Sequence, residues 1–430
     1  MRSADPGQTR HSSNAGSVAA PPLTRAEDGA EGALILRELP GEAGLLVWGA
    51  LRDVMLWTEA AAETRGLLFP PDGAATREGL VEAARMDRDL QELLLSLTSV
   101  ASAAGTIRAP SLADICLALA RWAETHSAPE TRLAFTQAAA LLRPGDAELA
   151  LETGRLARDL GHSARAESWL RRAVRLARNK DWETYVWAFM ALALMYWRAG
   201  NPAAAHALAH RALRKAHRHR LRVLKGTVLH NLLLFLADHD IRRAYEHAHA
   251  ALRAYGAAHP RVPILAQDVA CFWVNQGQYA RALPVIEAAL PRVEDPHERG
   301  LVSAALARAA AGAGERDLYE RARIDTLRTL AGAPSEARKA EALIILARAD
   351  VLAGEWTRAE AVALEAVTTA TGRGERFVRE AAAADLEAIR AHQDVGLTEP
   401  APESRDLARQ AMGLQAELLR SLQAPAAGDK

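Results

Sequence analysis

Histidine is the residue type whose spacing most suggests chemistry in this chain. Eight of the 14 histidines fall between His206 and His249. His206 and His210 are four residues apart, a spacing that would place two imidazoles on one face of a helix as metal ligands. No cysteine or nearby carboxylate completes a ligand set. We therefore expect these histidines to form a weakly basic, solvated face, and we predict neither a metal site nor a cofactor.

The cysteines and the known catalytic motifs give no sign of an enzyme. The chain has only two cysteines, Cys116 and Cys271, too few for a disulfide framework or a four-thiolate zinc site. Cys116 lies on the apolar face of an expected helix, where a buried structural thiol is typical, and no base accompanies Cys271. The sequence lacks a phosphate-binding loop, a Gly-x-Gly-x-x-Gly fingerprint, a His-Glu-x-x-His motif and a Gly-x-Ser-x-Gly motif. We expect a protein without catalytic activity.

A concentration of cationic side chains is the third candidate site. No Asp or Glu occurs between Thr184 and Ala237. The basic patch that we predict there consists of Arg211, Arg214, Lys215, Arg218, Arg220, Arg222 and Lys225. Trp182, Trp187 and Trp197 precede it, a mixture found in sites for nucleic acids and other polyanions. The first four cations also follow helical spacing near a helix C-terminus, where positive charge is favourable without a ligand. We expect foremost a solvated face, then contact with an acidic protein or peptide, and only then with nucleic acid.

The composition indicates close-packed helices. Half of the 430 residues are hydrophobic and a quarter are charged, which excludes a disordered chain. Aromatic residues make up only 5%, whereas sheets favour aromatic and β-branched side chains. The length allows two or three ordinary domains or one long repeat array.

The sequence shows no targeting or membrane-spanning segment. Residues 1–30 lack the apolar centre of a signal peptide, and we expect them to be a disordered tail. The longest apolar run, Val186 to Trp197, has 12 residues, whereas a membrane-spanning helix needs roughly 18–20. Together with the low cysteine content, this predicts a cytoplasmic protein that does not contact the membrane.

An internal repeat organises the middle of the chain. Its most regular feature is a series of alanines, Ala166, Ala205, Ala244, Ala282 and Ala359. Their successive spacings are 39, 39, 38 and 77, and a degenerate unit around Gly312–Leu330 fills the double interval. Several of these alanines follow a short break such as Gly200-Asn201. Two antiparallel helices approach most closely just beyond a tight turn, where only a small side chain fits. The spacing therefore predicts stacked helical hairpins.

This pattern resembles the tetratricopeptide repeat (TPR). The TPR signature places a small residue at position 8, an aromatic residue at 11, glycine near 15 and alanines at 20 and 27. Tyr196, Phe235 and Trp273 match the aromatic position, whereas Ala157 and Asp350 do not. The period of about 39 residues also exceeds the roughly 34 of the family. The resemblance implies an all-α, right-handed α-solenoid of antiparallel helical hairpins.

We expect three helical regions. The TPR-like array should cover residues 130–395. An irregular helical region, made of degenerate repeats or a cap, should precede it at residues 31–129. After the array, an amphipathic helix at residues 403–423 should close the last repeat, since terminal helices protect the end of a stack from solvent.

The resemblance also implies a binding surface. In TPR arrays, positions 2, 5, 9, 12 and 13 of the first helix of each hairpin line the concave groove. The partner-binding residues predicted in this way are Trp187, Met190, Leu194, Trp197, Arg198, Leu229, Leu233, Gln267 and Asn275. Cys271 falls on the same face. Members that clamp a C-terminal carboxylate carry Lys and Asn at positions 5 and 9. Position 5 is occupied here by Leu151, Met190, Leu229, Gln267 and Ile344, so we do not expect that mode of binding.

These features favour a non-catalytic scaffold or sensor that binds a peptide or protein partner in the concave groove. An apolar groove with a cationic flank suits an amphipathic ligand. One alternative is that the N-terminal helices fill the groove, which would make its side chains part of the core. A second is a regulatory protein that senses a peptide and controls transcription, although residues 31–129 contain no clear helix-turn-helix. A third is binding of a polyanion or nucleic acid through the basic 171–225 region.

Overall fold

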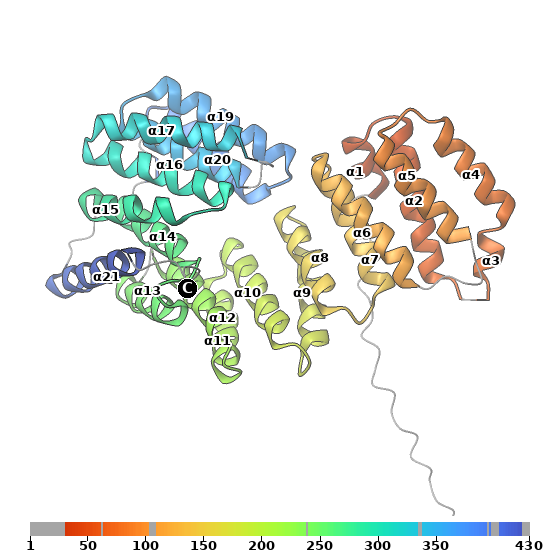
Figure 1. Ribbon diagram of the computed structural model, residues 1–430, viewed down its shortest axis with the longest axis horizontal. Helices are drawn as coiled ribbons and strands as arrows, with labels where there is room; N and C mark the ends of the chain where they lie inside the picture. The colour runs from red at the N-terminus through yellow and green to blue at the C-terminus, as the bar shows by residue number, and fades with distance from the viewer. Residues whose placement is uncertain are drawn as a thin grey trace, which may run out of the picture.

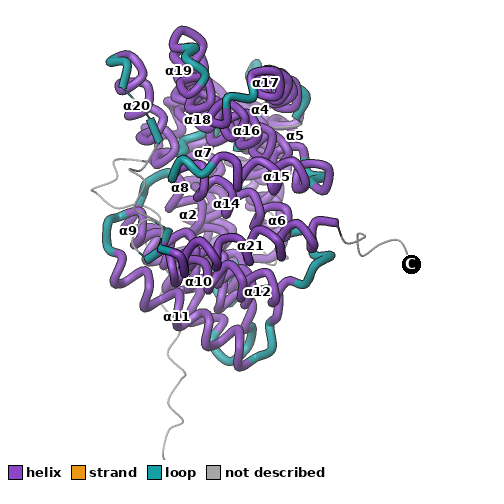
Figure 2. The backbone as a smooth tube through the Cα atoms, turned by 90° about the vertical axis from the view of Figure 1, so that its left-hand side faces the viewer, coloured by secondary structure: helices purple, strands orange, loops and turns teal. Residues whose placement is uncertain are grey.

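The computed structural model describes residues 31–61, 63–102, 109–237, 240–333, 338–393, 395–396 and 404–423. The expected disordered tail, residues 1–30, lies outside this part of the chain. Within it, the regular elements are α-helices and one short 3-10 helix, and no strand occurs (Figure 2). None of these helices is both long enough and apolar enough to span a membrane.

The first six helices cover the region expected to be irregular. They are α1 (Glu31–Glu38), α2 (Glu42–Glu59), α3 (Arg65–Leu68), α4 (Pro71–Ala83), α5 (Arg88–Ser102) and α6 (Ala109–Thr125). The helix α6 packs along α7 (Pro129–Leu142) as closely as the helices of later hairpins pack on each other. We therefore place the start of the hairpin stack at Ala109 rather than at residue 130.

The rest of the array continues the same arrangement (Figure 1). Its hairpins are α8 (Ala147–Asp159) with α9 (Ser163–Ala177), α10 (Trp182–Arg198) with α11 (Pro202–Arg218), α12 (Arg222–Leu236) with α13 (Ile241–Tyr255), α14 (Val262–Asn275) with α15 (Tyr279–Ala289), α16 (Pro296–Ala313) with α17 (Arg316–Ala331), and α18 (Lys339–Leu352) with α19 (Trp356–Gly372). The 3-10 helix η2 (Leu290–Arg292) follows α15, and α20 (Arg376–Arg390) packs on α19. The predicted right-handed α-solenoid is confirmed.

Small residues hold the hairpins together as the spacing predicts. All five repeat alanines have no exposed surface. Gly154 of α8 lies 12 residues before Ala166. Here α8 crosses α9 so closely that a Cβ on Gly154 would lie 2.7 Å from the Leu170 side chain. The hairpin α16–α17 fills the double interval between Ala282 and Ala359, and Ala322 is the buried alanine of that unit.

Helix starts are set by short polar side chains. The carboxylate of Asp181 accepts hydrogen bonds from the backbone N–H groups of Glu183 and Thr184 at the start of α10. Asn201 does the same for Ala204 at the start of α11. These N-caps satisfy backbone donors that have no partner inside the helix. The turn before α11 contains Gly200 with φ 72°, a left-handed conformation that favours glycine.

The helix α21 (Arg405–Gln423) does not close the last repeat, so this prediction is wrong. It packs instead across α13, α14 and α15, in the middle of the array. Gln415 Nε2 donates to the Arg281 carbonyl at 2.9 Å, and the imidazole Nδ1 of His249 lies 2.6 Å from Glu417 Oε2. An amphipathic sequence shows that a helix must pack its apolar face against another apolar surface, but it does not specify which part of the protein provides that surface.

The array curves until its beginning meets its end. A Cβ on Gly374, in the turn before α20, would lie 3.2 Å from Pro129 Cγ at the start of α7 and would also contact Leu160. Likewise Gly161, in the α8–α9 turn, faces the side chain of Arg376. The helices α8 and α10 therefore lie opposite α20 across the concave side of the superhelix.

The N-terminal helices do not fill that concave side. The helices α1 to α5 pack mainly on one another and on α6 and α7, at the far end of the molecule from α13, α14 and α15 (Figure 1). Their buried side chains form a core with the first hairpins. The alternative in which these helices seal the groove is therefore wrong.

Candidate partner-binding groove

The first helices of the hairpins surround a hollow on the concave side. A cavity of about 450 Å³ is lined by side chains from α10, α14, α16, α18 and α20. Three of the predicted groove residues, Trp197, Arg198 and Gln267, belong to it. A second cavity of about 380 Å³ shares Arg198 and Phe377 with the first and reaches Asp159 of α8. We call the two cavities together the central groove.

Aromatic side chains from opposite ends of the array form its apolar part. Trp197 is 37% exposed, and its ring stacks on Phe235 at 5.4 Å between centroids. Phe377 comes from α20, close in space but 180 positions later in the sequence. Ile344 and Ile345 of α18 complete this part of the lining. The groove thus offers apolar surface that the described part of the chain leaves accessible.

Arg198 connects the two sides of the groove. Its guanidinium lies 5.1 Å from the centroid of the Phe377 ring and 3.6 Å from the Asp159 carboxylate. Burial lowers the pKa of Arg198, with the neighbouring Arg158 adding to the effect. The structure therefore places this predicted groove residue between the two ends of the array.

Charges of both signs line the rest of the groove. Burial alone would lower the pKa of Arg338, but Glu341 and Glu298 together raise it. Arg338 Nε lies 2.9 Å from Glu341 Oε2. Burial raises the pKa of Glu375, and one of its carboxylate oxygens, Oε2, accepts no hydrogen bond from the described residues. The groove therefore has no strong excess of one charge.

Several predicted partner contacts are instead part of the core. Met190 of α10 and Leu229 and Leu233 of α12 are buried. Met190 belongs to a hydrophobic cluster that includes side chains of α12, and the two leucines belong to the cluster that includes α14. The inward sides of neighbouring hairpins pack on one another here, so these three side chains cannot touch a partner. Gln267 is also largely buried, and its Nε2 lies 3.3 Å from Cys271 Sγ, although it still borders the cavity.

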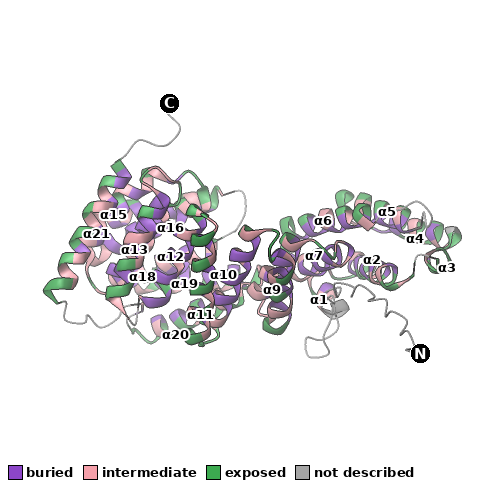
Figure 3. Ribbon diagram, turned by 90° about the horizontal axis from the view of Figure 1, so that it is seen from below, coloured by how far each residue is buried: buried purple, intermediate pink, exposed green. Residues whose placement is uncertain are grey.

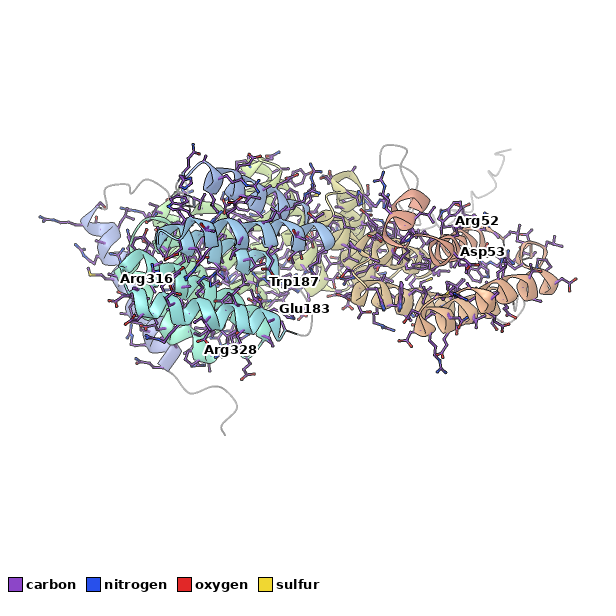
Figure 4. The ribbon with its side chains drawn as sticks, turned by 90° about the horizontal axis from the view of Figure 1, so that it is seen from above. Arg52, Asp53, Glu183, Trp187, Arg316 and Arg328 are labelled. Atoms are coloured by element: carbon purple, nitrogen blue, oxygen red, sulfur yellow. The ribbon has the colours of Figure 1, made fainter. Side chains whose placement is uncertain are left out.

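The remaining predicted residues lie beside the groove. Leu194 and Asn275 are partly exposed, and neither lines the two cavities. Trp187 lies in a different cavity of about 480 Å³ between α8 and α10, together with Glu183 of the preceding turn (Figure 4). The guanidinium of Arg155 lies 5.0 Å from the Trp187 ring centroid, so this indole already has a cationic neighbour.

The basic patch is exposed but does not form one surface. Arg211, Arg214 and Arg218 lie on α11, an outer helix, and no carboxylate of the described residues forms an ion pair with them. Lys215 Nζ lies 4.8 Å from the Trp182 ring centroid. Arg222 has a structural role instead, because its Nε donates to the Ala254 carbonyl at 2.9 Å.

The last two residues of the patch also lie off α11. Arg220 occupies the turn after α11 with φ 56°, and Lys225 lies in the first turn of α12, where it borders a small cavity with Arg222. The predicted set of seven cations therefore divides into an outer face on α11 and a group at the α11–α12 turn. Only the α11 group consists of neighbouring side chains on one helix.

The candidate chemical groups do not assemble into a reactive site. The rings of His206 and His210 are 6.5 Å apart, and burial lowers the pKa of the adjacent His247. No group of three His, Cys, Asp or Glu side chains in the described ranges could hold a metal ion. Burial raises the pKa of Cys116 to about 12 and that of Cys271 to about 11, so both thiols are protonated at neutral pH.

The far side of the groove was not identified from the sequence. Arg338, Arg348, Phe377 and Val378 line it, and none of them was assigned a binding role. Only Ile344 was mapped to an inward-facing position of α18. The repeat register could have extended that mapping to Arg348, one turn later. No local signal indicates that α20 returns to face α10, because this depends on the summed rotation between successive hairpins.

No protein-family model matches the chain, and no curated protein matches it. Among solved structures, the chain is similar to BtubC from P. vanneervenii, with 21% identity over 52% of this chain and 90% of that chain and a TM-score of 0.38. A Rap protein complexed with Competence and Sporulation Factor gives 12% identity over 86% and 99% of the two chains, with a TM-score of 0.42. Aspartyl phosphate phosphatase F from Bacillus subtilis gives 12% identity over 83% and 97%, with a TM-score of 0.32.

We draw no functional conclusion from similarities of this size. The hairpin stack and its alanine crossings themselves define the fold, which is that of a TPR-like helical repeat protein.

Proposed function

We propose that the chain is a non-catalytic interaction scaffold that binds a peptide segment of a partner protein in the central groove. The observation that carries this proposal is the position of Trp197, an aromatic side chain more than one third exposed inside a concave cavity. Large exposed aromatic side chains in a hollow are typical of the residues that dominate binding energy at protein interfaces.

The form and charge of the groove support a peptide with both apolar and charged side chains. Each cavity falls within the range of roughly 300–1,000 Å³ typical of ligand sites. Trp197 and Phe377 would contact an apolar side chain, while Arg338 and Glu341 could pair with charges on either side of it. Such a mixture favours an amphipathic segment over a purely apolar or purely anionic ligand.

The test is a selection of binding peptides followed by two tryptophan variants. Peptides from a random library would be selected on the wild-type chain, and their affinity measured by fluorescence polarisation. Trp197→Ala should weaken binding by about 2 kcal/mol or more, which is roughly thirtyfold. The matched control is Trp48→Ala, because Trp48 on α2 is 36% exposed but lies outside the groove. Selected peptides that bind Trp197→Ala as tightly as the wild type would contradict the proposal.

Binding of a polyanion on α11 is a second candidate function. Arg211, Arg214 and Arg218 are exposed side by side without a carboxylate partner in the described structure. Control of transcription through the N-terminal helices has less support. The exposed face of α2 carries Leu45, Trp48 and Leu56 with a single cation, Arg52, whereas DNA-binding surfaces are strongly basic.

A further inference from the structure

The chain turns back onto its own concave side after α20. Val395 is only 6% exposed and belongs to the hydrophobic core of the C-terminal hairpins. The carbonyl of the next residue, Gly396, accepts a hydrogen bond from Arg308 Nη2 at 2.5 Å. We call Val395 and Gly396 the return segment. It is held by one apolar side chain and one backbone carbonyl, the two kinds of contact by which a bound peptide is usually held.

The side chain that binds the return segment is an unusual one to find buried. Arg308 of α16 is 2% exposed, and burial lowers its pKa to about 10. No carboxylate in the described ranges forms an ion pair with it, and its Nε has no hydrogen-bond partner there. A buried guanidinium is costly unless it is paired or fully hydrogen-bonded. Arg308 is therefore only partly satisfied by the neutral carbonyl of Gly396.

A second arginine fixes the position of Gly396. A Cβ at this residue would lie 2.7 Å from Arg348 Cδ, and its φ is 70°, so glycine fits and larger residues do not. Asp385 of α20 holds Arg348 in place, with Arg348 Nε 2.6 Å from Asp385 Oδ2. The return segment thus rests on side chains of α16 and α18, and α20 holds one of these side chains in place.

The return segment and the central groove lie next to each other. Arg348 both lines the groove and contacts Gly396. On α18, Ile344 lines the groove and Arg348 follows one turn later. On α20, Ala381 lines the groove and Asp385 follows one turn later. One helical turn rises about 5.4 Å, so a peptide extending from the groove along α18 and α20 reaches the return segment within a residue or two.

We propose that the return segment is an intramolecular ligand that competes with the partner peptide for this part of the concave side. The inference depends on the proposed function, because it concerns regulation of the same groove. A partner that extends past Arg348 must displace Val395 and Gly396 before it can use Arg308. The free chain therefore binds the partner more weakly than a chain whose return segment has been released.

The experiment supplies the return segment as a separate molecule. The probe is a fluorescein-labelled peptide with the sequence of residues 391–400, added to the purified full-length chain. Val395→Lys in the protein places a cation beside Arg308 and Arg348 and should release the segment. This variant should bind the probe at least about tenfold more tightly than the wild type, because the chain's own return segment no longer occupies the binding site.

Two further variants make the result specific. Gly396→Phe should have the same effect by a different route, since the ring would collide with Arg348. Val223→Lys is the matched control, because Val223 on α12 is 43% exposed and lies away from the groove. Adding Arg308→Gln to the Val395→Lys chain should abolish probe binding. Circular dichroism melting curves identify any variant that does not fold.

The outcomes separate this inference from the proposed function. Equal probe affinities for the wild type, Val395→Lys and Gly396→Phe would overturn the inference. Library peptides that need Trp197 and bind the wild type and Val395→Lys equally would also overturn it, while leaving the proposed function intact. Trp197-dependent peptides that bind Val395→Lys about tenfold more tightly than the wild type would support both.

Discussion

Arg198 and Phe377 join the two sides of the superhelix, with the guanidinium carbon 5.1 Å from the ring centroid. Arg198 ends α10, and Phe377 lies in the first turn of α20. This cation–π pair joins parts of the array that are not neighbours, whereas the ion pair from Arg198 to Asp159 joins the consecutive hairpins α10–α11 and α8–α9. A simple repeat array has contacts only between consecutive units. The closed form of this array therefore depends on a few specific side chains.

We predict that Arg198→Gln opens the superhelix. The substitution removes an interaction of about 0.5–2 kcal/mol without removing a core side chain. The radius of gyration, measured by small-angle X-ray scattering, should increase. Arg52→Gln is the matched control, because Arg52 lies 5.8 Å from the Trp48 ring but joins no distant helices. An unchanged radius of gyration for Arg198→Gln would show that other contacts close the array.

The alanine crossings give a prediction on stability. Ala205 has no exposed surface, and Ala205→Leu should lower the free energy of unfolding by about 1–3 kcal/mol because the helices cannot move apart without strain. Ala203→Leu, at an exposed position on the same helix, should be nearly neutral. Urea denaturation measures both values. Equal effects would mean that Ala205 does not mark the closest approach of α10 and α11.

The pKa of Cys271 gives a prediction on pH dependence. Burial raises this pKa to about 11, so thiolate is the minor form below that pH. In a Cys116→Ser chain at pH 8, alkylation of Cys271 by iodoacetamide should be on the order of a hundredfold slower than that of a free thiol with a pKa of about 8.5. The rate should rise about tenfold per pH unit between pH 8 and 10. Mass spectrometry follows the reaction, and a rate that levels off near pH 9 would contradict the shift.

The exposed cations of α11 give a prediction on polyanion binding. Replacing Arg211, Arg214 and Arg218 with Gln should leave the far-UV circular dichroism spectrum unchanged, since all three are solvated. If α11 is a polyanion site, the wild type should elute from heparin at a higher salt concentration than this variant. A second triple variant, with Gln in place of the exposed Arg321, Arg405 and Arg409, is the control for the change in net charge. Co-elution of the two triple variants would show that α11 has no specific role.

The sequence predicted the hairpins well because their determinants are local. A buried alanine such as Ala244 and an N-cap such as Asp181 act within one or two turns of their own position. Spacing alone therefore gave the helix pairs and the all-α solenoid. Even the irregular unit was placed correctly, although its alanine, Ala322, lies outside the regular spacing.

The groove was predicted only in part because its shape is a property of the whole array. Trp197 and Arg198 were identified from their repeat positions, and both line the cavity. Leu233, the equivalent of Leu194 in the next hairpin, was also predicted to line the groove but is buried by the neighbouring hairpin. Phe377 was missed, because its contact with Arg198 arises from the rotation accumulated over five hairpins. No single repeat specifies this accumulated rotation.

The position of α21 has a consequence for the order in which the molecule can be completed. Gln415 bonds to the carbonyl of Arg281, 134 residues earlier in the chain. Ala411, Leu414 and Leu418 of α21 are fully buried against this part of the array. During synthesis, the matching apolar surface of α13 to α15 stays uncovered while the next two hairpins and α20 are made. At roughly 5–20 residues per second, that interval lasts on the order of ten seconds. The nascent protein therefore exposes a hydrophobic surface that α21 covers in the finished molecule, where it lies along α13 and α15 (Figure 3).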